Sequence, residues 1–234
     1  MTAIESPVAL NRLNRIPARL NEDAGRPSAV LVGLMPDAGH WHVIMTERAH
    51  HLAHHAGQIS FPGGKVDGAD NSLIDTALRE AHEEVAMPAD AVQVLGGLDM
   101  VVSPAGFVVQ PIVGLIAPDT RLVAAPDEVA RVLVLPLALL TDRSRHRQDS
   151  YLSDGRTRQF WVIDHDRHYI WGLSAAILVD LAARINGDAL RDVGGDAHNA
   201  GNAAGNASGN TSEEITGNIA GNIAGNIAGD ITGS

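Results

Sequence analysis

The chain has 234 residues, a formal net charge of −11 at pH 7 and no cysteine, and apolar residues make up 45% of it. This length suits one globular domain with an appendage, and the apolar share is sufficient for a core. The lack of cysteine in the sequence excludes disulfides, thiolate metal sites and a cysteine nucleophile, and the acidic balance argues against a nucleic-acid scaffold.

The first 20 residues contain no apolar run of the length that a signal peptide needs, and no stretch approaches about 20 consecutive apolar residues. We therefore expect a soluble, cytoplasmic protein without membrane contact. A small anionic substrate stays open, because a divalent cation and a few arginines can reverse the charge inside one cleft.

The predicted elements alternate between strands and helices along the chain. The first two strands, Ala29–Met35 and Trp41–Thr46, are separated by a Pro-Asp-Ala-Gly turn. A helix is expected over Ser72–Val85, and another over Leu173–Ile185 ends near Asn186-Gly187. The segments expected to form strands between them are Val92–Val102, Phe107–Ala117, Val129–Leu135, and a hairpin of Tyr151–Leu152 with Phe160–Ile163 around Asp154-Gly155. This order predicts an α/β (α+β) protein with a mixed β-sheet sandwiched between helices.

The composition changes near Gly194. From Gly195 to Ser234 there is no lysine, arginine or aromatic residue, and glycine recurs every four residues from position 201, with Glu213 at the one missing place. Few large apolar side chains and much backbone freedom make ordering cost more than burial returns, so we expect disorder here, with a solenoid or self-pairing segment as the alternative. The chain therefore divides into a domain over residues 1–190 and a low-complexity tail over residues 191–234.

The first expected helix carries an apolar stripe and, opposite it, three glutamates. The stripe consists of Leu73, Ile74, Ala77, Leu78, Ala81 and Val85. Glu80 and Glu84 lie one turn apart on one face, with Glu83 beside them. Like charges at this spacing cost about 0.2–0.5 kcal/mol per pair, so they need a cation, a proton or solvent.

Two glycines precede this helix. Gly63-Gly64 allows a close approach of backbone to ligand. Crowded carboxylate oxygens suit Mg²⁺ or Mn²⁺, which can polarise a phosphoryl oxygen and activate water, as pyrophosphate hydrolysis requires. The alternative is an ordinary amphipathic helix with a solvated acidic face, which the Gly-Gly loop, Arg79 and the whole spacing argue against.

The segment over residues 63–87 resembles the Nudix box, whose form is G-x5-E-x7-R-E-U-x-E-E-x-G-U with U a bulky aliphatic residue. The matching second half is Arg79-Glu80-Ala81-His82-Glu83-Glu84-Val85-Ala86-Met87, in which Ala81 and Ala86 depart from the pattern. The resemblance implies a Nudix fold, with Glu80 and Glu84 as metal ligands, Glu83 as a third ligand or water-orienting group, and Arg79 as the group that orients a ligand carboxylate. Asp70 stands one position out of register, so no role is assigned to it.

An upstream stretch is similar to the signature that precedes the box in the coenzyme A diphosphatase subfamily, roughly L-L-T-x-R-(S/A)-x3-(R/L)-x3-G-x3-F-P-G-G. It runs from Ile44-Met45-Thr46-Glu47-Arg48 through Gly57 to Phe61-Pro62-Gly63-Gly64. Trp171-Gly172-Leu173-Ser174-Ala175-Ala176 also resembles that subfamily, so the likeness covers most of the globular part. It implies hydrolysis of coenzyme A or acyl-CoA to 4'-phosphopantetheine, or its acyl form, and adenosine 3',5'-bisphosphate.

The substrate of such an enzyme carries a phosphate beside its pyrophosphate, so the site needs cations. Arg48, Gly63, Gly64 and Lys65 are the expected substrate-binding residues, and a basic cluster in an expected loop, Arg143, Arg145 and Arg147, is either a further phosphate contact or simply solvated. The histidines at 50, 51, 54 and 55 could pair on a helix as soft-metal ligands, but loop histidines near the substrate are the preferred interpretation.

Four points stay open. One alternative is a Nudix hydrolase of another nucleoside diphosphate derivative, such as ADP-ribose or NADH. Another is an inactive Nudix domain that acts as a ligand sensor. The group that activates the water lies between Glu83 and a residue outside the box, and a homodimer is one option for the assembly.

Overall fold

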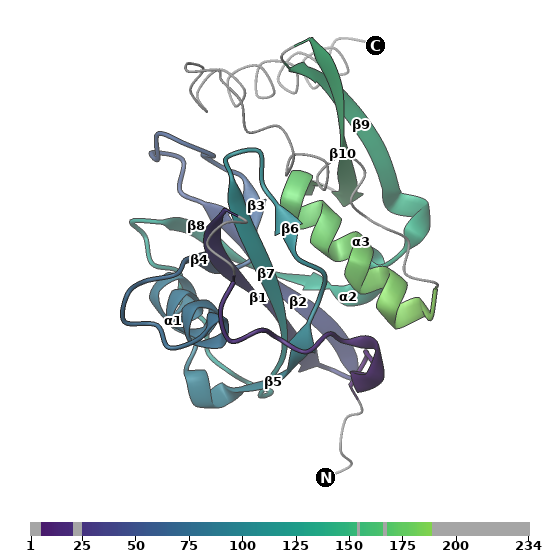
Figure 1. The fold of residues 1–234 in the computed structure, drawn as a ribbon. Helices are drawn as coiled ribbons and strands as arrows, with labels where there is room; N and C mark the ends of the chain where they lie inside the picture. The colour runs from purple at the N-terminus through teal and green to yellow at the C-terminus, as the bar shows by residue number, and fades with distance from the viewer. Residues whose placement is uncertain (1–5, 21–24, 154, 166–167, 189–234) are drawn as a thin grey trace, which may run out of the picture.

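The computed structural model describes residues 6–20, 25–153, 155–165 and 168–188. Figure 1 shows a twisted main sheet with one long helix on each side of it. The prediction of a mixed sheet sandwiched between helices is therefore confirmed. The tail over residues 191–234, for which we predicted disorder, lies outside the described residues.

The main sheet has eight strands among the described residues. They are β1 (Arg26–Asp37), β2 (His40–Arg48), β3 (Ile59–Ser60), β4 (Gly63–Lys65), β5 (Val92–Gly97), β6 (Val101–Val102), β7 (Phe107–Ile116) and β8 (Val129–Pro136). β1 and β7 run parallel and the other pairs run antiparallel, so the sheet is mixed. The expected turn between β1 and β2 is a two-residue turn in which Ala38 and Gly39 have φ angles of 47° and 81°.

A gap between β1 and β2 sets the position of the Gly63-Gly64 dipeptide. β1 and β2 pair from Gly33 opposite Ile44 to Asp37 opposite His40, and then diverge. The short strands β3 and β4 fill the gap, because β3 pairs with the end of β2 and β4 pairs with the start of β1. At the crossing between them, the Leu31 N–H donates to Pro62 O at 2.8 Å. The Gly63-Gly64 dipeptide is thereby fixed inside the sheet rather than in a free loop.

The two long helices bury opposite faces of the sheet. α1 (Leu73–Val85) places its apolar stripe on the face of Ala29 and Leu31, and α3 (Gly172–Asn186) packs on the face of Val30 and Val32. A fully buried aliphatic side chain stabilises the fold by about 1.5–3 kcal/mol, so each helix stabilises the protein through its own core cluster, one on each face of the sheet. The remaining short helical segments are α2 (Leu137–Leu140), η1 (Leu10–Arg12), η3 (Ala89–Ala91) and η4 (Arg143–Arg145). In the described part of the chain, no helix has the length and apolar character needed to cross a membrane.

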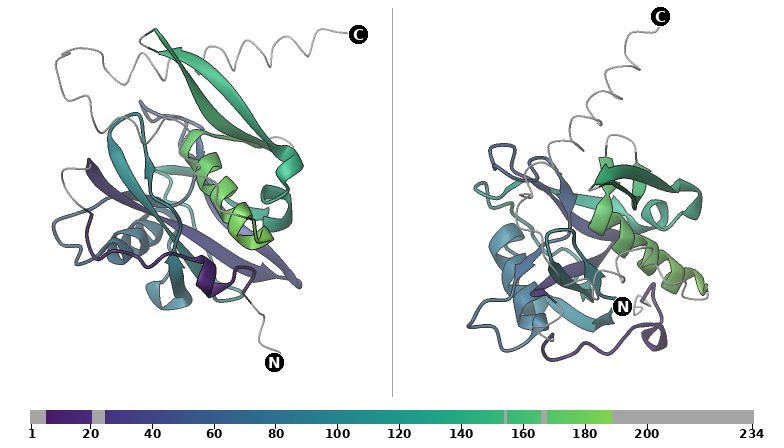
Figure 2. Two further views of the ribbon diagram at one scale, coloured as in Figure 1. Left: turned by 45° about the vertical axis from the view of Figure 1, so that its right-hand side comes forward. Right: turned by 45° about the horizontal axis from the view of Figure 1, so that its top comes forward.

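A second, three-stranded antiparallel sheet lies beside α3. It contains β9 (His146–Ser153), β10 (Arg156–His165) and β11 (His168–Trp171). The predicted hairpin is confirmed but is longer than expected, and Figure 2 shows it extending away from the main sheet. The prediction that Arg147 lies in a loop is wrong, because Arg147 pairs with Val162 within the β9–β10 ladder.

The expected strand over Val92–Val102 is interrupted. β5 ends at Gly97 and β6 begins at Val101. Leu98 is buried in the core, and the Asp99 N–H donates to the Asp180 carboxylate of α3 at 2.9 Å. Because the chain turns here to meet α3, the backbone leaves the ladder for three residues.

Candidate active site

The acidic face of α1 is set by the ends and packing of that helix. Ser72 precedes the helix and its hydroxyl accepts a hydrogen bond from the Asp75 N–H at 3.2 Å, which satisfies one of the free donors of the first turn. Leu73 and Ala77 are buried against the sheet. Their burial fixes the rotation of the helix, so the glutamates must project from the side that faces β4 and the solvent.

The helix ends at a residue in an unusual conformation. Ala86 adopts the left-handed region with φ 54° and ψ 31°. The Ala86 N–H donates to His82 O at 2.9 Å and the Met87 N–H donates to Ala81 O at 3.3 Å. Glycine is the usual residue at such a position, because it has no Cβ to oppose a positive φ. The position where the sequence carries alanine in place of the Nudix-box glycine is therefore the helix C-cap.

Gly64 of β4 lies directly against Glu80 of α1. A Cβ added to Gly64 would lie 2.4 Å from Glu80 Oε1 and 2.7 Å from Oε2. A Cβ on Gly63 would lie 2.5 Å from Ala29 O, so this residue has no room for a side chain either. Both glycines are thus required by close approach, the first to the backbone of β1 and the second to a carboxylate.

Arg79 connects the loop before α1 with its glutamates. Its guanidinium donates to Glu80 Oε1 at 3.0 Å, to Glu83 Oε2 at 3.0 Å and to the Lys65 carbonyl at 3.0 Å. The planar fork of arginine has five N–H donors and cannot deprotonate, which suits several simultaneous acceptors. The carboxylates of Glu80 and Glu83 are therefore held in place by the residue that the sequence predicted to orient a ligand.

Asp70 belongs to the same network, although the sequence assigned it no role. Its carboxylate accepts two hydrogen bonds from Arg79, each at 3.0 Å, and a third from the Thr76 hydroxyl at 2.9 Å. The hydrogen bonds from Arg79 lower the pKa of Asp70 to about 2. Asp70 stands one position away from the place of the acidic residue in the Nudix box, but it remains within hydrogen-bond distance of Arg79. Asp70 therefore holds the arginine in place.

Glu84 is the most deeply buried of the three glutamates, with 5% of its surface exposed. Burial raises the pKa of Glu84 to about 8, and the negative charges of Glu80 and Glu128 add to the effect. Arg48 and the N–H of Gly63 act in the opposite direction. Burial also raises the pKa of Glu80. A carboxylate held in this way needs either a proton or a nearby cation.

Glu128 was not singled out by the sequence. It lies outside the box in the loop before β8, yet its charge acts on both Glu80 and Glu84. The loop is fixed to α1 and β2, because the Ala125 N–H donates to Glu84 O and the Ala49 N–H donates to Glu128 O, both at 2.9 Å. No local motif marks Glu128, and only the pairing of distant segments places it here.

The donor set fits a hard divalent cation. Among the described residues, no group of three or more acidic or histidine side chains is arranged so that it could hold a metal ion by itself. Mg²⁺ usually binds through one or two carboxylates and keeps its other positions for water and phosphate oxygens. A buried, proton-binding Glu84 beside Glu80 meets that requirement, whereas a structural zinc site would need a closed set of four ligands.

The segment upstream of the box folds back onto this site. The Arg48 N–H donates to Gln58 O at 3.0 Å and the Gly57 N–H donates to Arg48 O at 3.1 Å, which closes the loop between them. Arg48 Nε is buried and meets no hydrogen-bond acceptor within the described part of the chain. Because Arg48 also lowers the pKa of Glu84, its charge lies near the carboxylates. The upstream signature and the box therefore meet in one place.

The structure also places two other groups of residues that the sequence singled out. Residues 50–55 lie in turns and bends, so the expectation that these histidines lie in a loop is confirmed and the alternative of a helical pair is excluded. The three arginines of the basic cluster each meet a carboxylate: Arg143 contacts Asp188, Arg145 contacts Asp142, and Arg147 contacts Asp149 and Asp164. Their charges are used in ion pairs rather than held free for phosphate.

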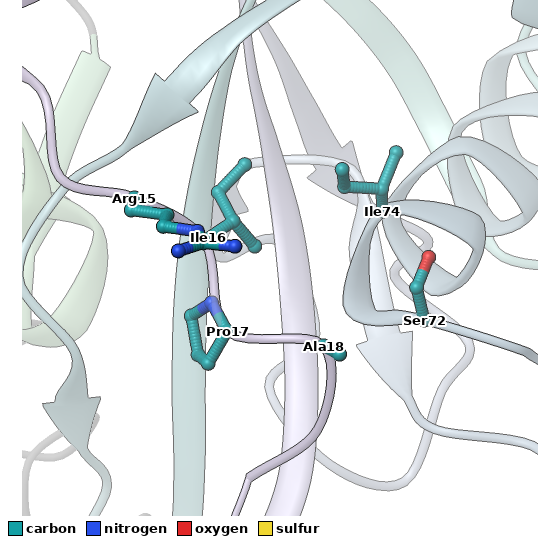
Figure 3. A pocket seen from close by; sticks show the side chains of 6 residues that line it. All are labelled: Arg15, Ile16, Pro17, Ala18, Ser72 and Ile74. Atoms are coloured by element: carbon teal, nitrogen blue, oxygen red, sulfur yellow. The ribbon is translucent and has the colours of Figure 1, made fainter.

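Cavity size does not identify the site. A cavity of about 520 Å³ lies between the N-terminal segment and the start of α1, and Figure 3 shows Ile16 and Ile74 on opposite sides of it. Arg15 is its one charged lining residue. Another cavity, of about 580 Å³, is lined by residues that include Trp41 and Pro136. Neither is lined by the glutamates of α1, so the chemistry and not the volume locates the candidate site.

Comparison with known proteins supports the same region. Residues 25–155 match the model of the NUDIX domain family. A protein named uncharacterized Nudix hydrolase NudL from Salmonella paratyphi B is 43% identical over 162 residues, covering 68% of this chain and 83% of that protein, and the protein of the same name from Salmonella newport matches equally. The crystal structure of a Nudix hydrolase from M. smegmatis, RenU, is 21% identical with a TM-score of 0.43, covering 50% of this chain and 74% of that one.

Proposed function

This chain belongs to the Nudix hydrolase family, and we propose that within it the chain hydrolyses the pyrophosphate bond of coenzyme A or an acyl-CoA with the help of Mg²⁺ or Mn²⁺. Products would be 4'-phosphopantetheine, or its acyl form, and adenosine 3',5'-bisphosphate. The observation that supports the proposal is that Arg48, with a buried Nε that meets no acceptor among the described residues, lies close enough for its charge to act on Glu84. It joins the upstream stretch that resembles the coenzyme A diphosphatase signature to the acidic face of the box.

Each residue of the site has a part in this proposal. Glu80 and Glu84 would hold the divalent cation, with Glu83 as a further ligand. When bound, the cation supplies Lewis-acid stabilisation of phosphoryl oxygens and lowers the pKa of water. Arg79 keeps Glu80 and Glu83 in position, and the Gly63-Gly64 backbone leaves the approach to Glu80 free of side chains.

Arg48 is proposed to hold the anionic oxygens of the substrate. Its buried Nε meets no acceptor among the described residues, and a buried guanidinium donor is stabilised when an oxyanion fills that place. The group that takes the proton of the attacking water is either Glu83 or Glu128. Both are exposed, and the charge of each acts on Glu80.

The test is turnover of coenzyme A by the purified protein in the presence of Mg²⁺, with adenosine 3',5'-bisphosphate measured by chromatography. The matched control is Glu84→Gln, which removes the charge of the buried carboxylate and keeps its size. Cleavage of ADP-ribose or NADH without cleavage of coenzyme A would overturn the substrate and keep the hydrolase. Binding of these nucleotides without any turnover would indicate a ligand sensor instead.

A further inference from the structure

A second cationic group lies next to the candidate site, on the other face of the sheet. It consists of the cationic side chains of Arg26 and Lys65 together with the ring of Phe107, and it is named here the Phe107 cluster. Arg26 CZ lies 3.9 Å from the centroid of the Phe107 ring, and Lys65 Nζ lies 5.5 Å from it. Two positive charges therefore converge on one aromatic ring, an arrangement in which the ring quadrupole attracts both cations.

The register of the sheet explains why these residues meet. Arg26 is opposite Phe107 in the parallel β1–β7 pair, and Lys65 is opposite Ser28 in the β1–β4 pair. Paired residues point to the same face, and so do residues two positions apart on one strand. The cluster thus lies on the face of Val30 and α3, whereas the neighbouring Gly64 faces Glu80 and α1.

Arg26 is held in place before any ligand arrives. Its backbone N–H donates to Gly106 O at 2.9 Å, and its guanidinium donates to Ala105 O in the same turn. The guanidinium lies over the ring of Phe107. A cation fixed in this way loses less conformational freedom when it binds an anion.

Within the described residues, the positive charge of the Phe107 cluster has no carboxylate partner. Arg26 and Lys65 are both exposed, and neither forms an ion pair with a carboxylate in the part of the chain that the structure describes. Lys65 is also the one lysine of a chain whose net charge is −11. The arginines at 143, 145 and 147, in contrast, are all neutralised by acids. Two like charges on one ring repel each other, and a bound anion would remove that repulsion.

We propose that the Phe107 cluster binds a phosphomonoester of the substrate, a group separate from the pyrophosphate that is cut. Lys65 directly follows Gly64, the glycine that contacts Glu80. An anion bound by Lys65 would therefore lie next to the reaction centre along β4 but on the opposite face of that strand. The inference rests on the proposed function, and in coenzyme A the group would be the 3'-phosphate. The cluster would then decide between 3'-phosphorylated and unphosphorylated substrates.

The first experiment compares coenzyme A with 3'-dephospho-coenzyme A, which has the same pyrophosphate and lacks only the phosphomonoester. The ratio of kcat/KM for the two substrates is measured for the wild type, Arg26→Met and Lys65→Met. Loss of a charge-assisted hydrogen bond should lower this ratio by about tenfold or more in each variant. The control is Arg143→Met, an exposed arginine that is already paired, and its ratio should stay at the wild-type value. An unchanged ratio in both cluster variants would overturn the proposal.

The second experiment does not depend on turnover. An amine-reactive reagent labels Lys65, and mass spectrometry of the peptide that contains this single lysine measures the extent of labelling. Adenosine 3',5'-bisphosphate should protect Lys65 at concentrations where AMP and inorganic phosphate do not. Absence of protection, or equal protection by inorganic phosphate, would refute the cluster as a substrate subsite. Protection without any cleavage of coenzyme A would instead keep the subsite and reject the proposed reaction.

Discussion

Gly64 on β4 is packed against the carboxylate of Glu80 on α1, with no space for even one methyl group between them. Replacing Gly64 by alanine would place a Cβ 2.4 Å from Glu80 Oε1, so the carboxylate must move. If Glu80 binds the metal, a displacement of this order should lower kcat/KM by about 100-fold, because catalytic geometry tolerates little misplacement. Steady-state kinetics at saturating Mg²⁺ measures the loss.

Gly68→Ala is the matched control for this substitution. Gly68 lies in the same loop, and a Cβ there would meet no atom within 4 Å. Its kcat/KM should remain within about twofold of the wild type, since a surface substitution without a clash has little effect. Equal activity of the two alanine variants would show that the Gly64–Glu80 contact does not matter for the reaction.

The buried carboxylate of Glu84 should have opposite effects on activity and on stability. Glu84→Gln removes a charge that burial disfavours, so the metal-free variant should have a higher Tm than the metal-free wild type at pH 8 and above. The same change removes a proposed metal ligand, and turnover should fall by at least about 100-fold, because the cation contributes several kcal/mol. Differential scanning calorimetry and kinetics on one preparation measure both. A variant that is less stable and fully active would contradict the assignment.

The stability of the metal-free protein should depend on pH through the same group. Folding raises the pKa of Glu84 from its usual 4.5 to about 8, so the folded state holds a proton that the unfolded state releases. The stabilisation is present below the unfolded pKa and is lost as pH rises through the folded pKa. With EDTA present, Tm should therefore decline between pH 5 and pH 8, and the decline should be smaller in Glu84→Gln. Saturating Mg²⁺ should reduce the decline in the wild type, since the cation replaces the proton.

Asp70 is predicted to act through Arg79. Asp70→Asn keeps the size of the side chain but loses the charge that the two hydrogen bonds from Arg79 stabilise, at a cost on the order of 2 kcal/mol of stability. Arg79 would then hold Glu80 and Glu83 less firmly, and kcat should fall by about tenfold with a higher Mg²⁺ requirement. Asp67→Asn, in the same loop and exposed, is the control. A purely structural role would lower Tm and leave the Mg²⁺ requirement unchanged.

The sequence predicted the part of the candidate site that lies on one helix. The spacing of Glu80, Glu83 and Glu84 defines a common face wherever the segment is helical, so three residues of the candidate site followed from a single local period. The same reasoning predicted a helix over Ser72–Val85 and the apolar stripe of α1, and the structure confirms both, with the helix beginning at Leu73. Gly63 and Gly64 were predicted to allow a close approach of backbone to ligand, whereas the structure shows Gly63 close to the backbone of β1 and Gly64 close to the Glu80 carboxylate.

The remainder of the site depends on contacts between segments far apart in the chain. Glu128 approaches the glutamates only because β8 pairs with β2, and Arg26 meets Lys65 only because β1 lies between β4 and β7. Strands as short as β3 and β4 have no periodicity that a sequence can reveal. The carboxylate partners of the basic cluster at 143–147 could not be predicted for a related reason, because they lie partly on β10 and at the end of α3.

The C-cap of α1 offers a substitution that should stabilise the protein. Ala86 has a φ of 54°, and this left-handed conformation costs a residue with a Cβ about 1–2 kcal/mol, whereas glycine adopts it freely. Glycine also makes the unfolded chain more flexible, which offsets part of the gain, so Ala86→Gly should raise the free energy of unfolding by roughly 0.5–1 kcal/mol. Urea denaturation in EDTA measures the change, and kcat/KM should remain at the wild-type value because Ala86 is exposed and lies beyond the glutamates.

Gly106→Ala, at a surface turn with a φ of 78°, is the reverse control for Ala86→Gly. It should destabilise the protein by a similar amount, because the added Cβ meets no atom and only the backbone conformation opposes it. If Ala86→Gly lowered stability while Gly106→Ala had no effect, the backbone conformation of α1 at its last turn would not be the one described.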